Sequence, residues 1–292
     1  MLTRREFTTL ALSILTVRLK PDATASAQTT GGVRLGVQTY SFRALPRPPG
    51  GDMVDVLVQA MTECGVRECE LWSPQIEPAQ VAREELRRWR IETPLDRFKA
   101  IRRKFNAGKI RIRAFNYSFN DSFTEPEIAR GFEIARALGA DFITASSTLS
   151  AAKRVAPFAE KRKMVVAMHN HSNLKDPNEF ATPESFAAAR ALSKYFKVNL
   201  DIGHFTAANY DAVAYIREHH DSIMNLHVKD RGRDQGPNLP WGEGNTPMRE
   251  VLRLLKETKW PIPAYLEYEY KGTGTPVEEV KKGLEYIRQA LA

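Results

Sequence analysis

Eight short apolar stretches rich in β-branched residues recur after residue 32, and each precedes a longer segment with helical periodicity. We place strands at 33–40, 67–71, 110–115, 141–145, 164–169, 197–201, 223–227 and 262–268. Strands that alternate with helices pair in parallel, because each helix returns the chain to the start of the next strand. Eight such units over roughly 250 residues are typical of a closed barrel. The pattern predicts an α/β fold, a single-domain (β/α)8 TIM barrel over residues 28–292.

A doubly wound open sheet is the alternative, and the first turn argues against it. A nucleotide-binding sheet of that kind has a glycine-rich turn after its first strand, whereas this chain reads Gln38-Thr39-Tyr40-Ser41-Phe42 there. Two long loops, 73–91 with an extra helix and 231–245, are expected to cover the barrel mouth. Capping threonines predict helix starts at five positions: Thr93, Thr124, Thr182, Thr246 and Thr275.

Polar clusters follow four of the predicted strands, and they contain four of the six histidines. The clusters are His169-Asn170-His171, Asp201-Ile202-Gly203-His204, His227-Val228-Lys229-Asp230 and Glu267-Tyr268-Glu269. They lie one strand–helix unit apart, about 30 residues. The carboxyl ends of parallel strands meet at one rim of a barrel, so imidazoles and carboxylates come together there. This arrangement predicts a metal site.

Composition narrows the class of protein. The chain has 292 residues, of which 42% are hydrophobic and 27% charged, as in a soluble globular enzyme. The net charge of +8 favours anionic partners only weakly, and no basic run is long enough for a nucleic-acid arm. Cys64 and Cys69 fall on successive elements whose side chains point apart, so we expect two reduced core thiols.

Residues 1–27 have the features of an export signal. The pair Arg4-Arg5, followed by Phe7, precedes a short apolar stretch, and Ala25-Ser26-Ala27 offers small residues for cleavage. The arginine pair resembles a twin-arginine signal, which implies a periplasmic or exported protein. The apolar stretch is too short for a stable membrane span.

Taken together, these motifs resemble the xylose-isomerase-like barrels, also called sugar phosphate isomerases/epimerases. The resemblance covers residues 33–290. It rests on the segment 36–42, Glu70 at the end of strand two, the four polar clusters, Gly242-Glu243-Gly244, and Glu267 on the last strand. The order and spacing of these motifs are specific for the superfamily and do not single out one reaction.

The resemblance implies one divalent metal ion held by strands five to eight. Carried over position by position, the ligands are His169, Asp201, His227 and Glu267. His169 is a departure, because the epimerases have Glu at that place. Two imidazoles and two carboxylates suit Mn²⁺, Zn²⁺, Co²⁺ or Fe²⁺ better than Mg²⁺. Glu269 shares a strand face with Glu267, so either can be the ligand.

A metal beside carboxylates suits proton removal next to a carbonyl. In the epimerases the strand-five and strand-eight glutamates serve opposite faces of the substrate. Here Glu267 remains, and a metal-bound His169 has no free lone pair. The second proton carrier would then be His171 or Lys229, although His171 can equally be a supporting polar residue and Lys229 an oxyanion contact.

Further contacts with a small sugar are implied by resemblance. They are Glu70, His204, Arg233 and Glu269. Three have structural alternatives: Glu70 can plug the barrel top, His204 can cap a helix, and Arg233 can be a solvated loop cation.

The first hypothesis is an isomerase or epimerase of a small sugar or ketose. The second is a lyase or hydrolase acting on keto-sugars or glycosides, for which one acid and one base suffice. A non-catalytic sugar-binding barrel ranks below both, because the ligand set is full. A nuclease with a three-zinc cluster is discounted, because no histidine precedes residue 169. We expect a sugar partner and no nucleic acid, and leave a homo-oligomer open.

Overall fold

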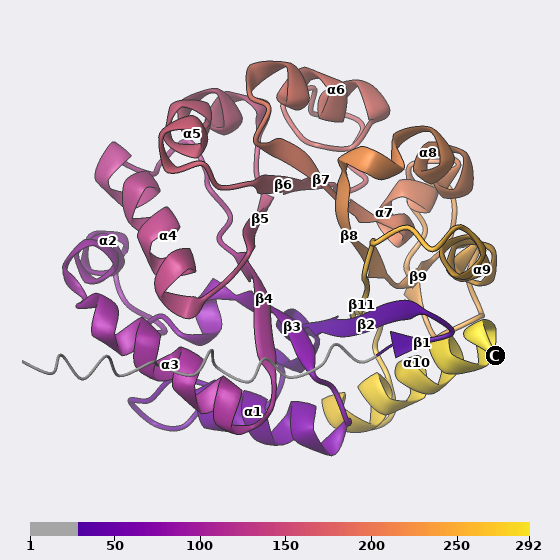
Figure 1. The fold of residues 1–292 in the computed structure, drawn as a ribbon, viewed down its shortest axis with the longest axis horizontal. Helices are drawn as coiled ribbons and strands as arrows, with labels where there is room; N and C mark the ends of the chain where they lie inside the picture. The colour runs from indigo at the N-terminus through magenta and orange to yellow at the C-terminus, as the bar shows by residue number, and fades with distance from the viewer. Residues whose placement is uncertain (1–28) are drawn as a thin grey trace, which may run out of the picture.

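Eight parallel strands close into a barrel in the computed structural model, which describes residues 29–292 (Figure 1). The barrel strands are β2 (Val33–Gln38), β3 (Glu68–Trp72), β4 (Arg111–Asn116), β5 (Phe142–Ser146), β6 (Val166–His169), β7 (Phe196–Asp201), β8 (Ile223–Val228) and β11 (Ala264–Leu266). Each pairs with its neighbours in sequence, and β11 closes the ring by pairing with β2. The predicted (β/α)8 TIM barrel is confirmed.

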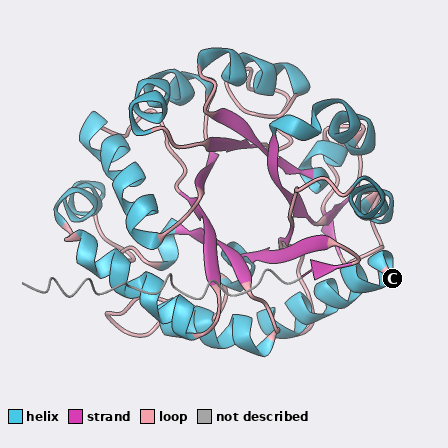
Figure 2. Ribbon diagram, viewed as in Figure 1, coloured by secondary structure: helices cyan, strands magenta, loops and turns pink. Residues whose placement is uncertain are grey.

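Helices surround the strands on the outside of the ring (Figure 2). Their bounds are α1 (Val54–Glu63), α2 (Arg83–Glu92), α3 (Leu95–Ala107), α4 (Glu125–Leu138), α5 (Leu149–Arg162), α6 (Pro183–Leu192), α7 (Ile202–Ala207), α8 (Ala212–His219), α9 (Met248–Thr258) and α10 (Pro276–Leu291). The main apolar core lies between these helices and the outward strand residues, among them Val37, Leu71, Phe115 and Leu226. This core fixes the strands and leaves their inward residues for other tasks.

Part of the barrel interior is filled by an apolar layer with a polar layer above it. Phe142, Ala114 and Ala167 form a small apolar cluster separate from the main core. Two residues further along β5, on the same face by the two-residue period of a strand, stands the buried Thr144. Side chains near the carboxyl ends of the strands are therefore the ones free to form a polar site.

Three of the five predicted helix caps are confirmed. Thr124, Thr182 and Thr275 each accept a hydrogen bond from the third helical residue in a complete capping box. The predictions for Thr93 and Thr246 are wrong: Thr93 ends α2, and Thr246 Oγ1 accepts a bond from the backbone N–H of Arg231 at 3.0 Å. Both threonines interact with a neighbouring segment instead of capping the following helix, and the spacing of residues alone does not reveal this.

The loop at 73–91 contains the expected extra helix. A short 3-10 helix, Ser73–Gln75, leads to α2, and arginines of α2 converge on the fully buried Glu127 of α4. Arg87 Nε donates to its carboxylate at 3.1 Å, and Arg90 NH1 lies 3.6 Å away. Ion pairs therefore fix α2 to the barrel wall.

The loop at 231–245 is also ordered. It starts with a two-stranded ribbon, β9 (Asp230–Arg231) and β10 (Asn238–Leu239). Asp230 Oδ2 then accepts bonds from the N–H groups of Gly242 and Gly244, each at 2.9 Å. The Gly242–Gly244 turn thus stays beside the end of β8.

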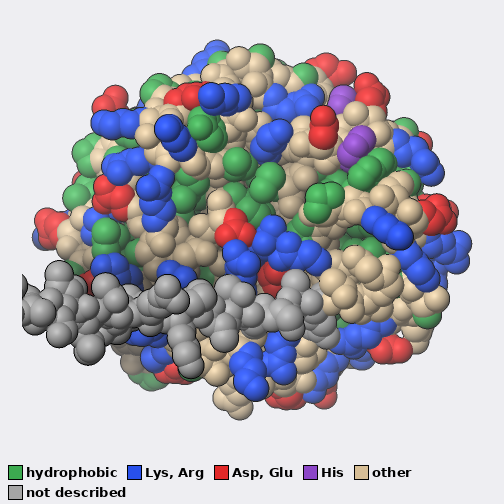
Figure 3. Space-filling view, viewed as in Figure 1, with side chains coloured by type: hydrophobic (Ala, Val, Ile, Leu, Met, Phe, Trp, Pro, Cys, Tyr) green, Lys and Arg blue, Asp and Glu red, His purple; other side chains and the backbone are tan. Residues whose placement is uncertain are grey.

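The predicted leader, residues 1–27, lies outside the described residues. Two other expectations concern residues that the structure describes. Cys64 and Cys69 are buried free thiols, as expected. Across residues 29–292, no helix combines the length and apolarity that crossing a bilayer requires. Figure 3 shows Lys and Arg interspersed with Asp and Glu on one face of the molecule.

Candidate metal centre and substrate cavity

Four predicted site residues meet at the carboxyl ends of adjacent strands. His169 ends β6, Asp201 ends β7, His227 pairs with Asp201 across β8, and Glu267 directly follows β11. All four are buried, and one ligand atom from each lies within 4.8 Å of the others. The ligand atoms of a tetrahedral zinc-sized ion are about 3.4 Å apart. Side-chain shifts on the order of an ångström would therefore let the set surround one cation.

Two of these atoms lack ordinary partners. Asp201 Oδ2 and His227 Nδ1 are buried and lie 4.0 Å apart, and neither makes a well-formed hydrogen bond with the described residues. Asp201 Oδ2 has the Lys229 ammonium 3.0 Å away as an ion-pair partner, and Glu267 Oε2 is 3.3 Å from His227 Nδ1 at an angle that does not make a hydrogen bond. Buried polar atoms without a hydrogen bond are costly, and a coordinated cation would satisfy them. The donor set fits Mn²⁺, Fe²⁺, Co²⁺ or Zn²⁺.

Glu70 supports this centre from below. Its side chain is fully buried, and its Oε2 accepts a bond from His227 Nε2 at 2.8 Å. Five more side chains, one from each of β2, β4, β5, β7 and β8, donate to the same carboxylate. Gln38, Asn116 and Thr144 donate to Oε1, and Asn199 and Asn225 donate to Oε2. A carboxylate on the far nitrogen orients a metal-binding imidazole. Glu70 therefore plugs the barrel and aims His227 Nδ1 at the centre, a position that offers no contact with a sugar hydroxyl.

Lys229 reaches into the same place. Its Nζ lies 3.0 Å from Asp201 Oδ2 and 3.1 Å from Glu267 Oε2, and it also bonds to Glu269. Burial lowers the pKa of an ammonium group, but these three carboxylates outweigh that effect and raise the pKa of Lys229. Lys229 therefore stays charged. It can donate a proton or stabilise an oxyanion, and it has no lone pair with which to act as a base.

The ligand candidates differ in charge. Burial lowers the pKa of His169 well below its usual value, so this imidazole is neutral. Burial acts in the same direction on His227, but Glu70 and Glu267 outweigh it and raise that pKa. Burial would raise the pKa of Glu267, yet Lys229 and His227 lower it well below the usual range. The described centre thus combines a neutral imidazole, His169, with charged groups of both signs.

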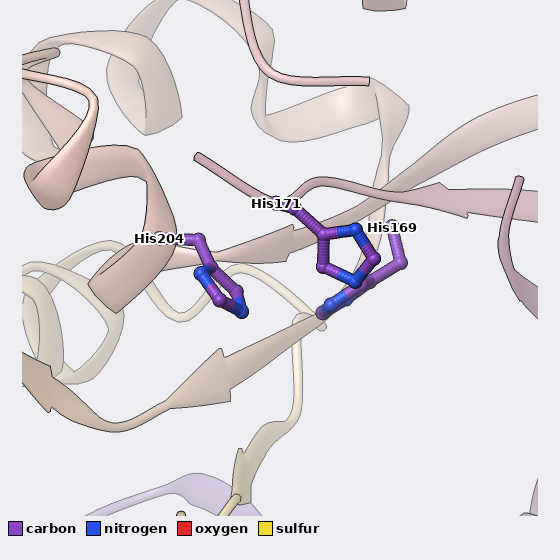
Figure 4. Close-up of side chains that lie close together, drawn as sticks. All are labelled: His169, His171 and His204. Carbon is purple, nitrogen blue, oxygen red and sulfur yellow. The ribbon is translucent and has the colours of Figure 1, made fainter. Parts of the chain in front are cut away.

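Three histidines form a second group beside the first (Figure 4). The ring centroid of His171 lies 5.2 Å from those of both His169 and His204. Both nitrogens of His204 already face cations, Lys229 Nζ at 2.8 Å and an Arg231 nitrogen at 2.6 Å. A neutral imidazole has one lone pair, so His204 has none left for a metal. Of the two histidine groups, the four-residue centre is the better cation site.

The imidazole of His171 is oriented by a carboxylate. Its Nδ1 lies 2.7 Å from Glu179 Oε1, and its side chain is 42% exposed. A carboxylate on Nδ1 fixes the tautomer that has its lone pair on Nε2, as in catalytic histidine pairs. This geometry suits the predicted proton carrier.

A polar cavity of about 230 Å³ opens above the centre. It is lined by Gln38, Tyr40, Trp72, Asn116, Ser118, Ser146, His169, His171, His204, His227, Glu267 and Glu269. Drug-sized ligands occupy about 300–1,000 Å³, so this cavity suits a smaller polar molecule. Tyr40 and Trp72 meet edge to face, with ring centroids 4.8 Å apart, and form an aromatic wall.

The predicted substrate contacts divide into two groups. Glu269 and His204 line the cavity, as a sugar contact requires. Arg233 does not: it is exposed in the β9–β10 loop, and its backbone N–H bonds to Asn245 Oδ1 at 3.1 Å. Two residues earlier, Arg231 bonds to His204, to Ser172 at 3.0 Å and to the Gly236 carbonyl. The turn of this loop directs Arg231 inward and Arg233 outward, so the prediction for Arg233 is wrong in geometry.

Sequence analysis missed four contributors to the site. They are Asn199, Asn225, Glu179 and Arg231. Asn199 and Asn225 precede Asp201 and His227 by two residues, so the strand period marked them as inward-facing. Nothing in the sequence marked Glu179, because it lies eight positions beyond His171, in a loop.

The fold and the residues at its rim match a known group of proteins. The profile described as xylose isomerase-like TIM barrel matches residues 58–290. The chain belongs to this family. Among curated proteins, it is 26% identical to the L-ribulose-5-phosphate 3-epimerase UlaE of Salmonella paratyphi A over 98 residues. That match spans 34% of this chain and 34% of the epimerase, so it covers about a third of the relative's length.

Solved structures share the fold over most of the chain. The E. coli 3-keto-D-glucoside 4-epimerase YcjR is 12% identical, with a TM-score of 0.64 over 87% of this chain and 98% of that one. The IOLI protein with a bound zinc atom is 13% identical, with a TM-score of 0.65 over 88% and 97%. At these identities the likeness shows the barrel and no more.

Proposed function

We propose that the chain is a metal-dependent isomerase or epimerase that removes a proton next to the carbonyl of a small sugar or ketose. The observation that carries this proposal is the buried cluster of His169, Asp201, His227 and Glu267 under a small polar cavity, in which Asp201 Oδ2 and His227 Nδ1 make no well-formed hydrogen bond. Sugar epimerases are among the curated and solved proteins that this chain resembles, which supports the same class of substrate. His169, Asp201, His227 and Glu267 would hold the ion.

A divalent cation supplies positive charge beside the carbonyl oxygen, which favours loss of the neighbouring proton. His171, held through Nδ1 by Glu179, accepts that proton at Nε2. Glu267 and Lys229 lie at another part of the cavity floor. From there the Lys229 ammonium stabilises negative charge on the substrate oxygen or donates a proton back to the substrate. Tyr40 and Trp72 pack on the sugar, and Glu269 and His204 bind its hydroxyls.

The test is isotope exchange with a panel of free ketoses in D₂O. We expect deuterium at the carbon next to the carbonyl, and a loss of about 10²–10⁴-fold in exchange for His171→Asn with its metal content unchanged. Metal content is measured in parallel: about one transition metal per chain, lost in His227→Ala and kept in His220→Ala. Full metal occupancy in His227→Ala would refute the ligand assignment.

A lyase or hydrolase acting on keto-sugars or glycosides is the second candidate. His169 stands where the epimerases have a glutamate, so His171 is the one remaining candidate base among the proposed catalytic residues. One base together with one acid suffices for a lyase or hydrolase. Cleavage of keto-glycosides without deuterium exchange into any ketose would replace isomerisation by this reaction.

We also propose that the protein is exported through its twin-arginine leader. The support is the Arg4-Arg5 pair followed by an apolar stretch. Cell fractionation tests it: the full chain should be periplasmic, and Arg4→Lys with Arg5→Lys should remain in the cytoplasm. A periplasmic double variant would contradict the twin-arginine route.

A further inference from the structure

The side chain of Lys229 occupies the space around which the metal ligands gather. Its side chain is 3% exposed, and its three ammonium protons face four acceptors. Two of these, Asp201 Oδ2 at 3.0 Å and Glu267 Oε2 at 3.1 Å, are atoms of the proposed ligand set. The other two are Glu269 Oε2 and His204 Nε2. The ammonium thus has one pair of partners inside the centre and one pair beside it.

A divalent cation and this ammonium cannot both keep those two oxygens. A zinc-sized ion binds oxygen at about 2.0–2.2 Å, which would bring it within a few ångströms of Nζ. At that distance in a buried site, a double and a single positive charge repel strongly. Entry of a metal therefore requires Lys229 to withdraw.

The surroundings of Lys229 offer a place for it to go. Glu269 is 19% exposed, lines the cavity, and also accepts a bond from Asn238 Nδ2 at 3.4 Å. Gly203 packs directly against the stem, since a Cβ there would be 2.7 Å from Lys229 Cγ. The stem therefore has no room to move toward Gly203.

His204 destabilises the position of the Lys229 ammonium beside Asp201 and Glu267. Its two nitrogens face Lys229 and Arg231, yet a neutral imidazole accepts from only one of them. One of the two contacts is always a donor facing a donor. Movement of Lys229 away from His204 removes that conflict.

We propose that Lys229 is an internal competitor for the cation site: its ammonium neutralises Asp201 and Glu267 when no metal is present, moves to Glu269 when a metal binds, and so sets the metal affinity. This inference rests on the metal centre of the proposed function. It assigns Lys229 a role that is separate from proton transfer. The competition keeps the metal-free barrel folded and leaves the site exchangeable.

The direct test is Lys229→Met, which keeps an unbranched stem and removes the charge. Zinc and manganese affinities are measured by competition with a chromophoric chelator, and thermal unfolding is followed with and without metal. We expect binding tighter by about ten- to a hundredfold, the equivalent of losing one or two charge-assisted bonds to the ammonium. The metal-free variant should melt below the wild type, because its carboxylates are left uncompensated. Lys175→Met, an exposed lysine, is the control for the change in net charge.

A second variant acts in the opposite direction. Glu269→Gln removes the charge that receives Lys229, so metal binding should weaken. In the Lys229→Met background the same change should have little effect, because no ammonium is left to receive. This double-mutant cycle isolates the coupling between the two side chains, and Glu269→Gln alone keeps the test valid if metal-free Lys229→Met does not fold.

The outcomes separate this inference from the metal centre itself. A wild-type chain that binds neither zinc nor manganese overturns both. A wild-type chain that binds metal, with unchanged or weaker affinity in Lys229→Met, overturns the competition alone. Equal effects of Glu269→Gln with and without Lys229 also overturn it.

Discussion

Glu70→Gln is the most informative single change in the barrel. Three side-chain donors address each carboxylate oxygen of Glu70, at distances from 2.6 to 3.3 Å. An amide replaces one acceptor oxygen by an NH₂ group, so three donors lose their acceptor and meet another donor. His227 loses its charged partner in either orientation of the amide, and it also loses its hydrogen bond if the amide nitrogen takes the place of Oε2.

The cost follows from burial. Leaving one buried donor without a partner costs about 1–3 kcal/mol, and breaking a buried charged pair costs about 3–5 kcal/mol in total. We therefore expect the free energy of unfolding to fall by about 4 kcal/mol. At about 2–4 °C per kcal/mol for a chain of this size, the melting temperature should fall by about 10 °C.

Metal affinity supplies an independent reading of the same change. Removing a partner that orients a ligating imidazole weakens binding by about 10–100-fold. Thermal unfolding by circular dichroism and zinc competition are both measured, with the exposed Glu257→Gln as control. A variant that melts within about 2 °C of the wild type and binds zinc equally well would refute the role of Glu70 as the orienting carboxylate, because changes at neutral surface sites have effects of that size.

Three further predictions concern the rest of the barrel. Burial raises the pKa of Glu127, but bonds from Thr124 and the α2 arginines lower it overall, so its stabilisation is present above about pH 4.5 and is lost as the pH falls through the folded pKa. The difference in urea stability between Glu127→Gln and wild type at pH 7 should therefore shrink as the pH falls below about 4.5; a constant difference would contradict this. Burial raises the pKa of the Cys64 thiol to about 11 and that of Cys69 well above its usual value, so neither should react with a disulfide reagent at pH 8 before unfolding, and rapid labelling of the native chain would show otherwise. Gly203→Ala places a Cβ 2.9 Å from the Lys229 carbonyl oxygen, so we expect a loss of about 1–3 kcal/mol in a thermal melt, and an unchanged melt would disprove the close approach.

Strand positions were readable from sequence because each barrel strand is a short apolar run between helices. The last strand is shorter than predicted, Ala264–Leu266 instead of 262–268. The N–H of Glu267 still bonds to the Val228 carbonyl of β8 at 3.1 Å, and Tyr268 then leaves the strand ladder, since its N–H bonds to Ser41 Oγ at 2.9 Å. A pattern of side chains shows the apolar period and does not show where backbone pairing stops.

The site was predictable only where it follows the strand ends. His169, Asp201, His227 and Glu267 were brought together by the parallel register that the repeat implied. The inward turn of Arg231 and the pairing of His171 with Glu179 depend on loop conformation, which no period encodes. The role of Glu70 required the ring to be closed, because its donors come from strands far apart in sequence.

The ring of donors around Glu70 also bears on how this cylinder can change over evolutionary time. One carboxylate on β3 binds side chains of β2, β4, β5, β7 and β8. A substitution at any of those positions disturbs the others, so we expect the floor of the pocket to change as one unit. Diversification of substrate preference is then left to the walls, at the rim positions Trp72, His171 and Arg231.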